Sequence, residues 1–427
     1  MSIDTGLEPA LPPLALDTLP GVAADLAARA EQHDREGSFP HESVARVHEA
    51  GLLTATVAGQ YGGPDAGLAA TVEILRALGA ADPSVALVTA MTLFTHAAQA
   101  AAARSGAPGW PLRHYRSLLR DSAEGPALVN ALRVEPELGT PARGGLPATV
   151  ARLDERTGDW LLTGHKIFST GAVGLRWLAV WARTDEQLPR VGSFLLRAPE
   201  PGLVPGMRIE ATWDHLGLRA SRSDDVYFDA VHVPADAASG LVDPAATDPR
   251  RDPGLAVWNN LGLTALYLGV AESARDWLIG FLNTRTPSAL GRPLATVPRF
   301  QDEVGQIEAQ LIAATDLVTG LALRHDAGDP QAAAHAPAAK LIGTRAAIDA
   351  VQRAVALVGN NALTRRNPLE RHLRDVLCAR VHTPQDDSIL GALGRGALAR
   401  PSAAPADRTT TGSTATATDH PTAAQNG

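Results

Sequence analysis

The sequence predicts an α+β protein of several domains, with a β domain between two helical domains. Residues 126–236 hold short segments rich in Val, Trp, Phe and Tyr, separated by Gly, Pro or Asp. Segments of this length and spacing are typical of a β sandwich or barrel. The flanking residues, 20–125 and 250–400, have apolar side chains at helical spacing. A chain of 427 residues is long enough for two or three such domains.

The N-terminal region predicts a flexible arm followed by helices. Residues 1–19 are rich in proline and carry neither a basic segment nor a long apolar run, so no secretory signal is predicted. In ADPSVALV, Asp82 is a favourable N-cap and Pro83 suits the first helical position. No stretch approaches the roughly 20 apolar residues of a membrane span. We therefore expect a cytoplasmic protein with no membrane partner.

The C-terminal region predicts long helices that need partners. Apolar residues from Phe300 to Leu321 recur every three or four positions, and a second seam runs from Leu341 to Val358. Two long seamed helices favour a helical bundle and an oligomer. Residues 401–427 lack the apolar side chains that stabilise an ordered state, so a disordered tail is expected.

Composition excludes several classes of protein. The formal net charge is -8 and no Lys/Arg cluster offsets it, which argues against a nucleic-acid partner. Cys378 is the one cysteine of the sequence, so no internal disulfide can form, and a packed small hydrophobe is its expected role. The acidic pair Asp386 and Asp387 has one histidine nearby, His382, so no metal site is predicted.

Three segments indicate function through their residues and through their order along the chain. They are NALRVEPELGTP (130–141), GHKIFSTGA (164–172) and WDHLGLRASRSDDVYFDAVHVP (213–234). Each alone is ordinary turn chemistry at a strand end. Together they resemble the acyl-CoA dehydrogenase superfamily, as do GQYGGPDAG and ALVGNNALTRRNPLERHLRDVL, over about residues 20–400. The resemblance implies a C-terminal four-helix bundle, a flavin between the β domain and the bundle, and usually a tetramer built as a dimer of dimers.

The resemblance also implies flavin-binding residues. RVEP looks like the loop that holds the isoalloxazine ring, with Val134 in place of the usual threonine, and KIFSTGA looks like the second flavin-holding strand. Arg285 and Gln301 match positions that contact the phosphates or adenosine of a neighbouring subunit's flavin; a surface ion pair and a helix-face amide are the alternatives. A glycine-rich turn is replaced by Gly359-Asn360-Asn361, which leaves FAD and FMN both open. The full set is Val134, Glu135, Pro136, Phe168, Ser169, Thr170, Arg285, Gln301, Gly359 and Asn360.

The catalytic base of a dehydrogenase is missing from the sequence. Such an enzyme removes a proton alpha to a thioester carbonyl with a carboxylate whose pKa is raised by burial. Alignment on the Arg374-Asp375 pair places Thr383 where the family usually has glutamate, and the alternative position on an earlier helix falls near Asn259. Neither side chain can act as a base. Asp386 is instead interpreted as part of a helix start, with Thr383 as N-cap and Pro384 at N1.

The flavin-dependent monooxygenase branch of the superfamily, such as dibenzothiophene monooxygenase, resembles the chain better. That branch lacks the base, takes reduced flavin from a separate NAD(P)H:flavin reductase and forms a C4a-hydroperoxide with O2. Its polar set matches His96, Asn130, Thr170 and His382. We therefore predict a two-component monooxygenase of a small organic substrate. An acyl-CoA dehydrogenase with an unusual base and a non-catalytic flavoprotein scaffold are the alternatives.

Overall fold

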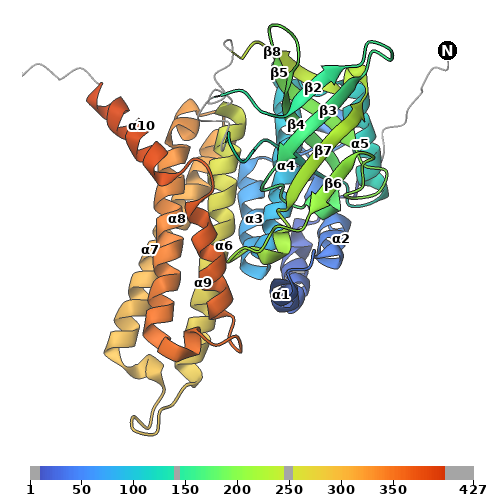
Figure 1. Cartoon of the computed structure of the whole chain (residues 1–427). Coiled ribbons are helices and arrows are strands. Elements are labelled where there is room, and N and C mark those ends of the chain that lie inside the picture. Colours follow the sequence, from blue (N-terminus) through green and yellow to red (C-terminus); the bar gives the residue numbers. More distant parts are fainter. Residues whose placement is uncertain (1–9, 139–144, 245–252, 400–427) are drawn as a thin grey trace, which may run out of the picture.

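Helices, strands and helices follow one another along the chain in the predicted order (Figure 1). The computed structural model describes residues 10–138, 145–244 and 253–399. Residues 1–9 of the predicted arm, Gly139 to Pro141 of the flavin loop and the predicted tail 401–427 lie outside the described residues.

The N-terminal domain consists of helices, of which α4 forms the centre. The predicted cap of α4 is confirmed, because Asp82 Oδ1 accepts the backbone N–H groups of Ser84 and Val85 at 2.9 and 3.3 Å. α4 is long and apolar enough to cross a membrane, yet 67% of its most apolar stretch is buried inside the protein, as in a core helix. The helices are α1 (Leu19–Glu36), α2 (His41–Glu49), α3 (Leu68–Ala81), α4 (Pro83–Ser105) and α5 (Leu112–Glu124).

The described strands form one eight-stranded mixed sheet in the order β6-β7-β3-β2-β4-β5-β8, with β1 pairing in parallel with β4. The last strand runs to Val242, beyond the predicted boundary at residue 236, because β8 adds to the edge of β5. The strands are β1 (Leu128–Leu132), β2 (Val150–Leu153), β3 (Trp160–Lys166), β4 (Leu175–Thr184), β5 (Val191–Arg197), β6 (Met207–Glu210), β7 (Asp225–Val233) and β8 (Ala238–Val242).

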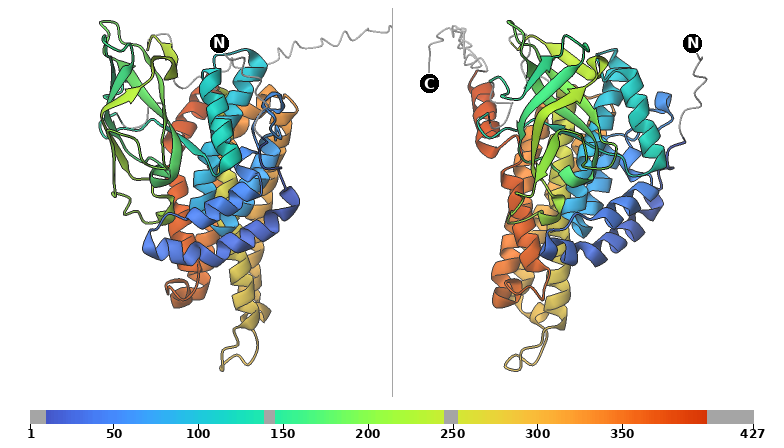
Figure 2. Two further views of the ribbon diagram at one scale, coloured as in Figure 1. Left: turned by 90° about the vertical axis from the view of Figure 1, so that its right-hand side faces the viewer. Right: turned by 45° about the vertical axis from the view of Figure 1, so that its right-hand side comes forward.

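The C-terminal domain is a bundle of antiparallel helices from which the last helix projects (Figure 1). The predicted seam of α7 is buried at Ile307, Leu311, Ala314 and Leu321, so it faces the bundle interior. Figure 2 shows the sheet beside the upper part of the bundle, with the N-terminal helices packed against both. The helices are α6 (Pro253–Thr284), α7 (Pro298–Asp326), α8 (Pro330–Val358), α9 (Leu369–Leu377) and α10 (Asp386–Leu398).

Glycine permits the close crossing of α3 and α6, which fixes the N-terminal domain on the bundle. A Cβ at Gly79 would lie 2.2 Å from the carbonyl oxygen of Leu266, and one at Gly269 would lie 2.0 Å from that of Arg76. Real Cβ atoms do not approach a carbonyl so closely, so both positions need glycine. The crossing fixes α6 against the N-terminal domain.

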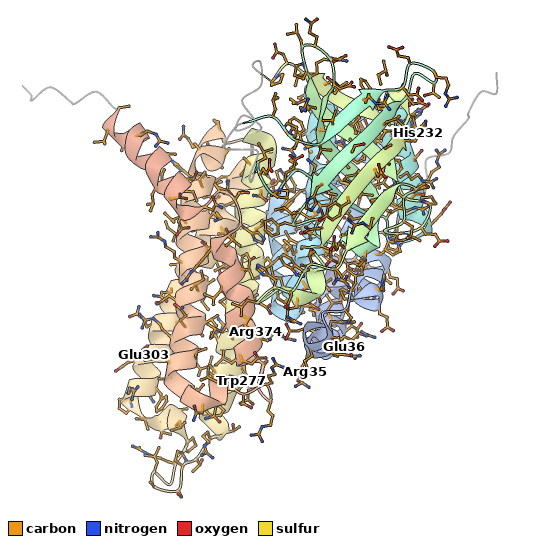
Figure 3. The ribbon with its side chains drawn as sticks, in the orientation of Figure 1. Arg35, Glu36, His232, Trp277, Glu303 and Arg374 are labelled. Carbon is orange, nitrogen blue, oxygen red and sulfur yellow. The ribbon has the colours of Figure 1, made fainter. Side chains whose placement is uncertain are left out.

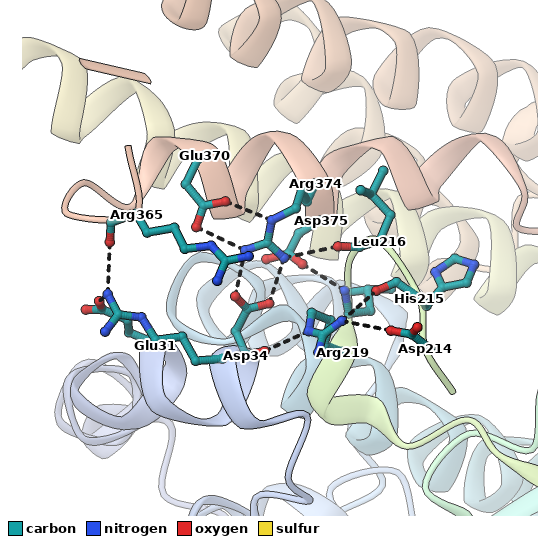
Figure 4. Close-up of polar contacts among 12 residues, drawn as sticks. Glu31, Asp34, Asp214, His215, Leu216, Arg219, Arg365, Glu370, Arg374 and Asp375 are labelled. Atoms are coloured by element: carbon teal, nitrogen blue, oxygen red, sulfur yellow. Dashed lines mark hydrogen bonds and ion pairs between the residues drawn. The ribbon is translucent and has the colours of Figure 1, made fainter. Parts of the chain in front are cut away.

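A network centred on Arg374 of α9 joins the three domains (Figures 3 and 4). Its guanidinium binds both carboxylate oxygens of Asp34 in α1, at 2.6 and 2.9 Å, and donates to the Leu216 carbonyl at 3.0 Å. Arg219 donates to the Asp34 carbonyl at 2.8 Å, and the Leu218 N–H donates to Asp375 at 2.8 Å. Bidentate Arg–carboxylate pairs fix geometry well. The network therefore fixes the position of α9, from which the chain continues to His382.

Candidate active site

The segment that carries His382 links α9 to α10, and its helix start differs from the prediction. α10 begins at Asp386 with Gln385 in the N-cap position, so the predicted cap at Thr383 is wrong. Asp386 instead accepts a hydrogen bond from Arg345 of α8 at 2.9 Å, and Asp387 accepts the Ser388 N–H. Asp386 thus pairs with an arginine that is distant in the sequence and does not form the predicted capping box. Both carboxylates have structural partners, as expected.

The two positions expected to carry the catalytic base of a dehydrogenase are in contact in the structure. Asn259 of α6 donates its side-chain Nδ2 to the backbone carbonyl of Thr383 at 2.7 Å, although the residues are 124 positions apart. Both side chains are uncharged, and neither can take a proton from a carbon acid at neutral pH. The contact therefore brings the two candidate base positions together without supplying a carboxylate at either one.

His382 is held by a tyrosine that the sequence did not single out. Its Nδ1 lies 2.8 Å from the hydroxyl of Tyr267, which is 1% exposed in α6. Burial, with the charges of Lys340 and His215, lowers the pKa of His382 to about 4. Burial also raises the pKa of Tyr267 well above its usual value. At neutral pH, a neutral imidazole thus faces a protonated phenol. A tyrosine within the aliphatic stretch LGLTALYLGV was the signal available in the sequence.

Lys340 of α8 is a second residue that the sequence reasoning missed. It is 1% exposed, and its Nζ has no hydrogen-bond partner among the described residues. Burial lowers its pKa, and the charge of Asp386 opposes that shift. A buried ammonium without a partner is costly. Its charge helps to keep His382 neutral.

Asn130 in the middle of β1 contacts Thr170, which lies in the loop after β3. Asn130 Nδ2 donates to the Thr170 carbonyl at 3.0 Å. The Thr170 hydroxyl is 3.1 Å from that of Ser223, which is 2.8 Å from that of Ser221. All four residues are buried. The structure therefore joins two predicted site residues and links them to a row of hydrogen-bonded hydroxyls. The repeated serines of RASRS were the signal of this row in the sequence.

His96 has a hydrogen-bond partner of its own, just as His382 is bonded to Tyr267 and not to the Asn130–Thr170 pair among the described residues. It is fully buried on α4, and its Nδ1 lies 3.1 Å from the hydroxyl of Tyr115. Burial lowers its pKa to about 4. Its Nε2 has no partner among the described residues. No hydrogen bond in the described structure joins His96 to Asn130, Thr170 or His382, so its catalytic role stays a prediction.

Glu135, predicted to hold flavin, has its carboxylate occupied by the protein itself. Lys166 Nζ lies 2.5 Å from Oε1, Thr149 donates its hydroxyl at 2.6 Å, and the Ala148 N–H donates at 2.6 Å. Burial acts to raise the pKa of Glu135, but Lys166 and these donors hold it below its usual value. Glu135 thus anchors the loop from within. The flanking residues remain candidates for contact: Val134, whose carbonyl accepts the Ile167 N–H, and the exposed Pro136.

Phe168 is the strongest structural sign of a ring-binding surface. It is 56% exposed and has a φ of 55°, a left-handed conformation that is costly for a bulky side chain. Its ring meets that of Trp213 edge to face at 6.3 Å, and Trp213 stacks on His215 at 4.2 Å. The next residue, Ser169, has a buried hydroxyl without a hydrogen-bond partner among the described residues. An exposed aromatic side chain beside an unsatisfied hydroxyl suits a planar, polar-edged ligand.

The remaining predicted cofactor residues lie near the C-terminal ends of α6 and α8 and the N-terminal end of α7, the end of the bundle farther from the sheet (Figure 1). Arg285 follows the C-terminus of α6, about 39 Å along the helix from Asn259 at 1.5 Å per residue. Gln301 donates to the Ala295 carbonyl at 3.0 Å, and Gly359 adopts a φ of 57°. These three residues and Asn360 are exposed. Within one chain they do not join the region around His382.

Comparisons with known proteins match this architecture. The family descriptions "Acyl-CoA dehydrogenase, N-terminal domain", "middle domain" and "C-terminal domain" match residues 21–105, 134–231 and 261–386. The chain is 30% identical to L-evernosamine nitrososynthase of a Micromonospora species, covering 84% of each chain. It is 29% identical to the putative acyl-CoA dehydrogenase YdbM of Bacillus subtilis, covering 88% of this chain and 94% of that one.

A solved structure adds a ligand to the comparison. KijD3, in complex with FMN and dTDP-3-amino-2,3,6-trideoxy-4-keto-3-methyl-D-glucose, superposes with a TM-score of 0.71 at 27% identity. The match covers 90% of this chain and 92% of KijD3.

Proposed function

The chain belongs to the acyl-CoA dehydrogenase family, and we propose that it is a flavin-dependent monooxygenase of that family. The observation that carries the proposal is the contact between Asn259 and Thr383. Alpha-proton abstraction requires a base within hydrogen-bond reach of the substrate. The two positions where the family is expected to carry it hold uncharged side chains, which supports a reaction other than dehydrogenation of a thioester.

The proposed cofactor is FAD or FMN, bound beside Phe168, Trp213 and Ser169. The exposed phenyl ring and the unsatisfied Ser169 hydroxyl fit a flavin ring with polar edges, and FMN in the related KijD3 supports this choice. When bound in its reduced form, the flavin supplies the two electrons that activate O2. We propose that a separate NAD(P)H:flavin reductase delivers it.

The chain's own polar groups suit oxygen chemistry. His382 is neutral at pH 7 and can donate a hydrogen bond to a developing oxygen anion, and Asn130 of β1 fixes the backbone of Thr170 through a hydrogen bond to its carbonyl. The proposed substrate is a small organic molecule with an oxidisable heteroatom. The nitrososynthase name of one relative and the amino-sugar nucleotide bound to KijD3 support an amine.

We also propose a homotetramer in which Arg285, Gln301, Gly359 and Asn360 contact the flavin of a neighbouring subunit. Their exposure, and their distance along α6 from the His382 region, support this role, since a second chain could bring them to the cofactor. Sedimentation of the flavin-loaded protein measures the assembly directly, and a monomer at working concentration would contradict it.

A specific observation favours one rival, an acyl-CoA dehydrogenase with an unusual base. YdbM is named as one, and burial raises the pKa of Asp375 to about 7, which suits a base. However, Asp375 Oδ1 already accepts the Leu218 N–H at 2.8 Å, and the residue lies in the Arg374 network. The Asp375 carboxylate is therefore part of the hydrogen-bond network that joins the three domains.

Anaerobic titration with acyl-CoA thioesters separates these two functions. Protein loaded with oxidised FAD or FMN is expected to keep its visible absorbance when short-, medium- and branched-chain acyl-CoAs are added, because neither Asn259 nor Thr383 can accept the alpha proton. Asp375→Asn serves as the control for the rival. Bleaching in the wild type that disappears in Asp375→Asn would contradict the monooxygenase proposal and identify the base.

A further inference from the structure

The hydrogen bond between Tyr267 and His382 determines which ring nitrogen carries the proton. We propose that Tyr267 is a positioning residue that holds His382 as the neutral tautomer protonated on Nε2, so that this nitrogen is the hydrogen-bond donor in the site. The inference rests on the proposed function for its catalytic meaning but makes a structural claim of its own.

The direction of the bond follows from what each atom can do. A tyrosine hydroxyl has one hydrogen to donate, and neutral imidazole has one donor and one acceptor nitrogen. The Tyr267 oxygen lies 2.8 Å from Nδ1 in a position that is 1% exposed. If Nδ1 carried the proton, the phenolic hydrogen would have no acceptor among the described residues, and an unsatisfied buried donor costs about 1–3 kcal/mol. Donation from Tyr267 to Nδ1 satisfies both groups.

The charges around His382 favour the neutral ring that this bond requires. Lys340 from α8 and His215 from the β-domain loop act against a positive charge on His382. Asp386 at the start of α10 already pairs with Arg345 at 2.9 Å. Beside Tyr267, Asp375 and Cys378 act against a phenolate, so the phenol keeps its proton. Both partners therefore have the protonation states that a Tyr O–H to Nδ1 bond needs.

The positioning also depends on the backbone that carries the ring. α6 holds this segment at two points, through Asn259 on the Thr383 carbonyl and through Tyr267 on the imidazole. The two α6 residues are eight positions apart, about 12 Å along the helix. One rigid helix thus sets both the place of the loop and the orientation of the ring, as positioning groups do in active sites.

The tautomer can be measured on the full-length protein without flavin or substrate. In solid-state 15N NMR of protein labelled at histidine, His382→Gln identifies the His382 signals by their loss. We expect wild-type His382 at pH 7 to show an unprotonated Nδ1 and a protonated Nε2. We expect Tyr267→Phe, which keeps the ring volume, to shift the His382 signals toward a mixture of tautomers. A protonated Nδ1 in the wild type, or unchanged His382 signals in Tyr267→Phe, would overturn the inference.

Steady-state kinetics tests whether the hydrogen bond between Tyr267 and His382 affects turnover. We expect Tyr267→Phe to lower kcat by about tenfold with KM unchanged, less than the effect of about 10²–10³-fold for losing the hydrogen-bond donor itself. Tyr227→Phe is the matched control, because Tyr227 lies on β7 stacked on His165, and it should leave both kcat and the His382 signals unchanged. If oxygen transfer is not observed in any variant while the NMR result holds, the proposed function fails and the positioning inference stands.

Discussion

Replacing His382 by glutamine is expected to lower the rate of oxygen transfer to the substrate by about 10²–10³-fold, the range for loss of one positioned hydrogen-bond donor to a developing oxygen anion. O2 consumption should continue, because two electrons from reduced flavin can still convert O2 to H2O2. The expected signature is therefore a fall in product per O2 consumed, measured with an oxygen electrode and a peroxide assay.

The pH dependence and a control refine this expectation. Because the pKa of His382 is lowered to about 4, the ring stays neutral and the wild-type rate should not change through its titration between pH 8 and about 5. His232→Gln is the control, since His232 lies on β7, 2.8 Å from Asp159 and remote from the bundle (Figure 3). A normal yield of product from His382→Gln would show that His382 has no role in oxygen transfer.

Replacing Lys166 by methionine is expected to destabilise the protein by about 3–5 kcal/mol, the usual cost of breaking a buried ion pair. Lys166 is 0% and Glu135 2% exposed, and their atoms are 2.5 Å apart. Burial lowers the pKa of Lys166 to about 8, so it is still mostly charged at pH 7. The variant leaves the Glu135 carboxylate buried with its charge uncompensated.

Denaturant unfolding of matched variants measures this effect. The double variant Glu135→Gln with Lys166→Met should recover part of the loss, because it removes both charges. Arg29→Met breaks the exposed pair with Glu42 and should cost about 0–1 kcal/mol. Equal stability of Lys166→Met and Arg29→Met would show that the Glu135 contact does not anchor the loop.

Much of the fold could be predicted because its signals are local. The Asp82 cap, the strand-like segments of residues 126–236 and the seam of α7 each depend on neighbouring residues, and all three appear in the structure. The capping box at Thr383 failed for the same reason. It is a local pattern, and the Asp386 carboxylate instead finds Arg345, 41 residues away.

The candidate site was less accessible to sequence reasoning because its contacts are long-range. Tyr267 reaches His382 across 115 residues, and Asn259 reaches Thr383 across 124. Helical periodicity indicates which face of α6 is buried but not which distant loop it meets. Glu135 shows the converse, since its motif pointed to a ligand while the structure places Lys166 against it.

In the proposed function, this chain directs electrons from flavin to O2, and Asn259 and Thr383 replace the base of thioester dehydrogenation. The most direct test of this function is the rate at which protein-bound reduced flavin regains the absorbance of oxidised flavin after rapid mixing with O2. We expect a delay relative to free reduced flavin, which His382→Gln shortens and His232→Gln leaves unchanged. Reoxidation as fast as that of free flavin, with no difference between the two variants, would contradict it.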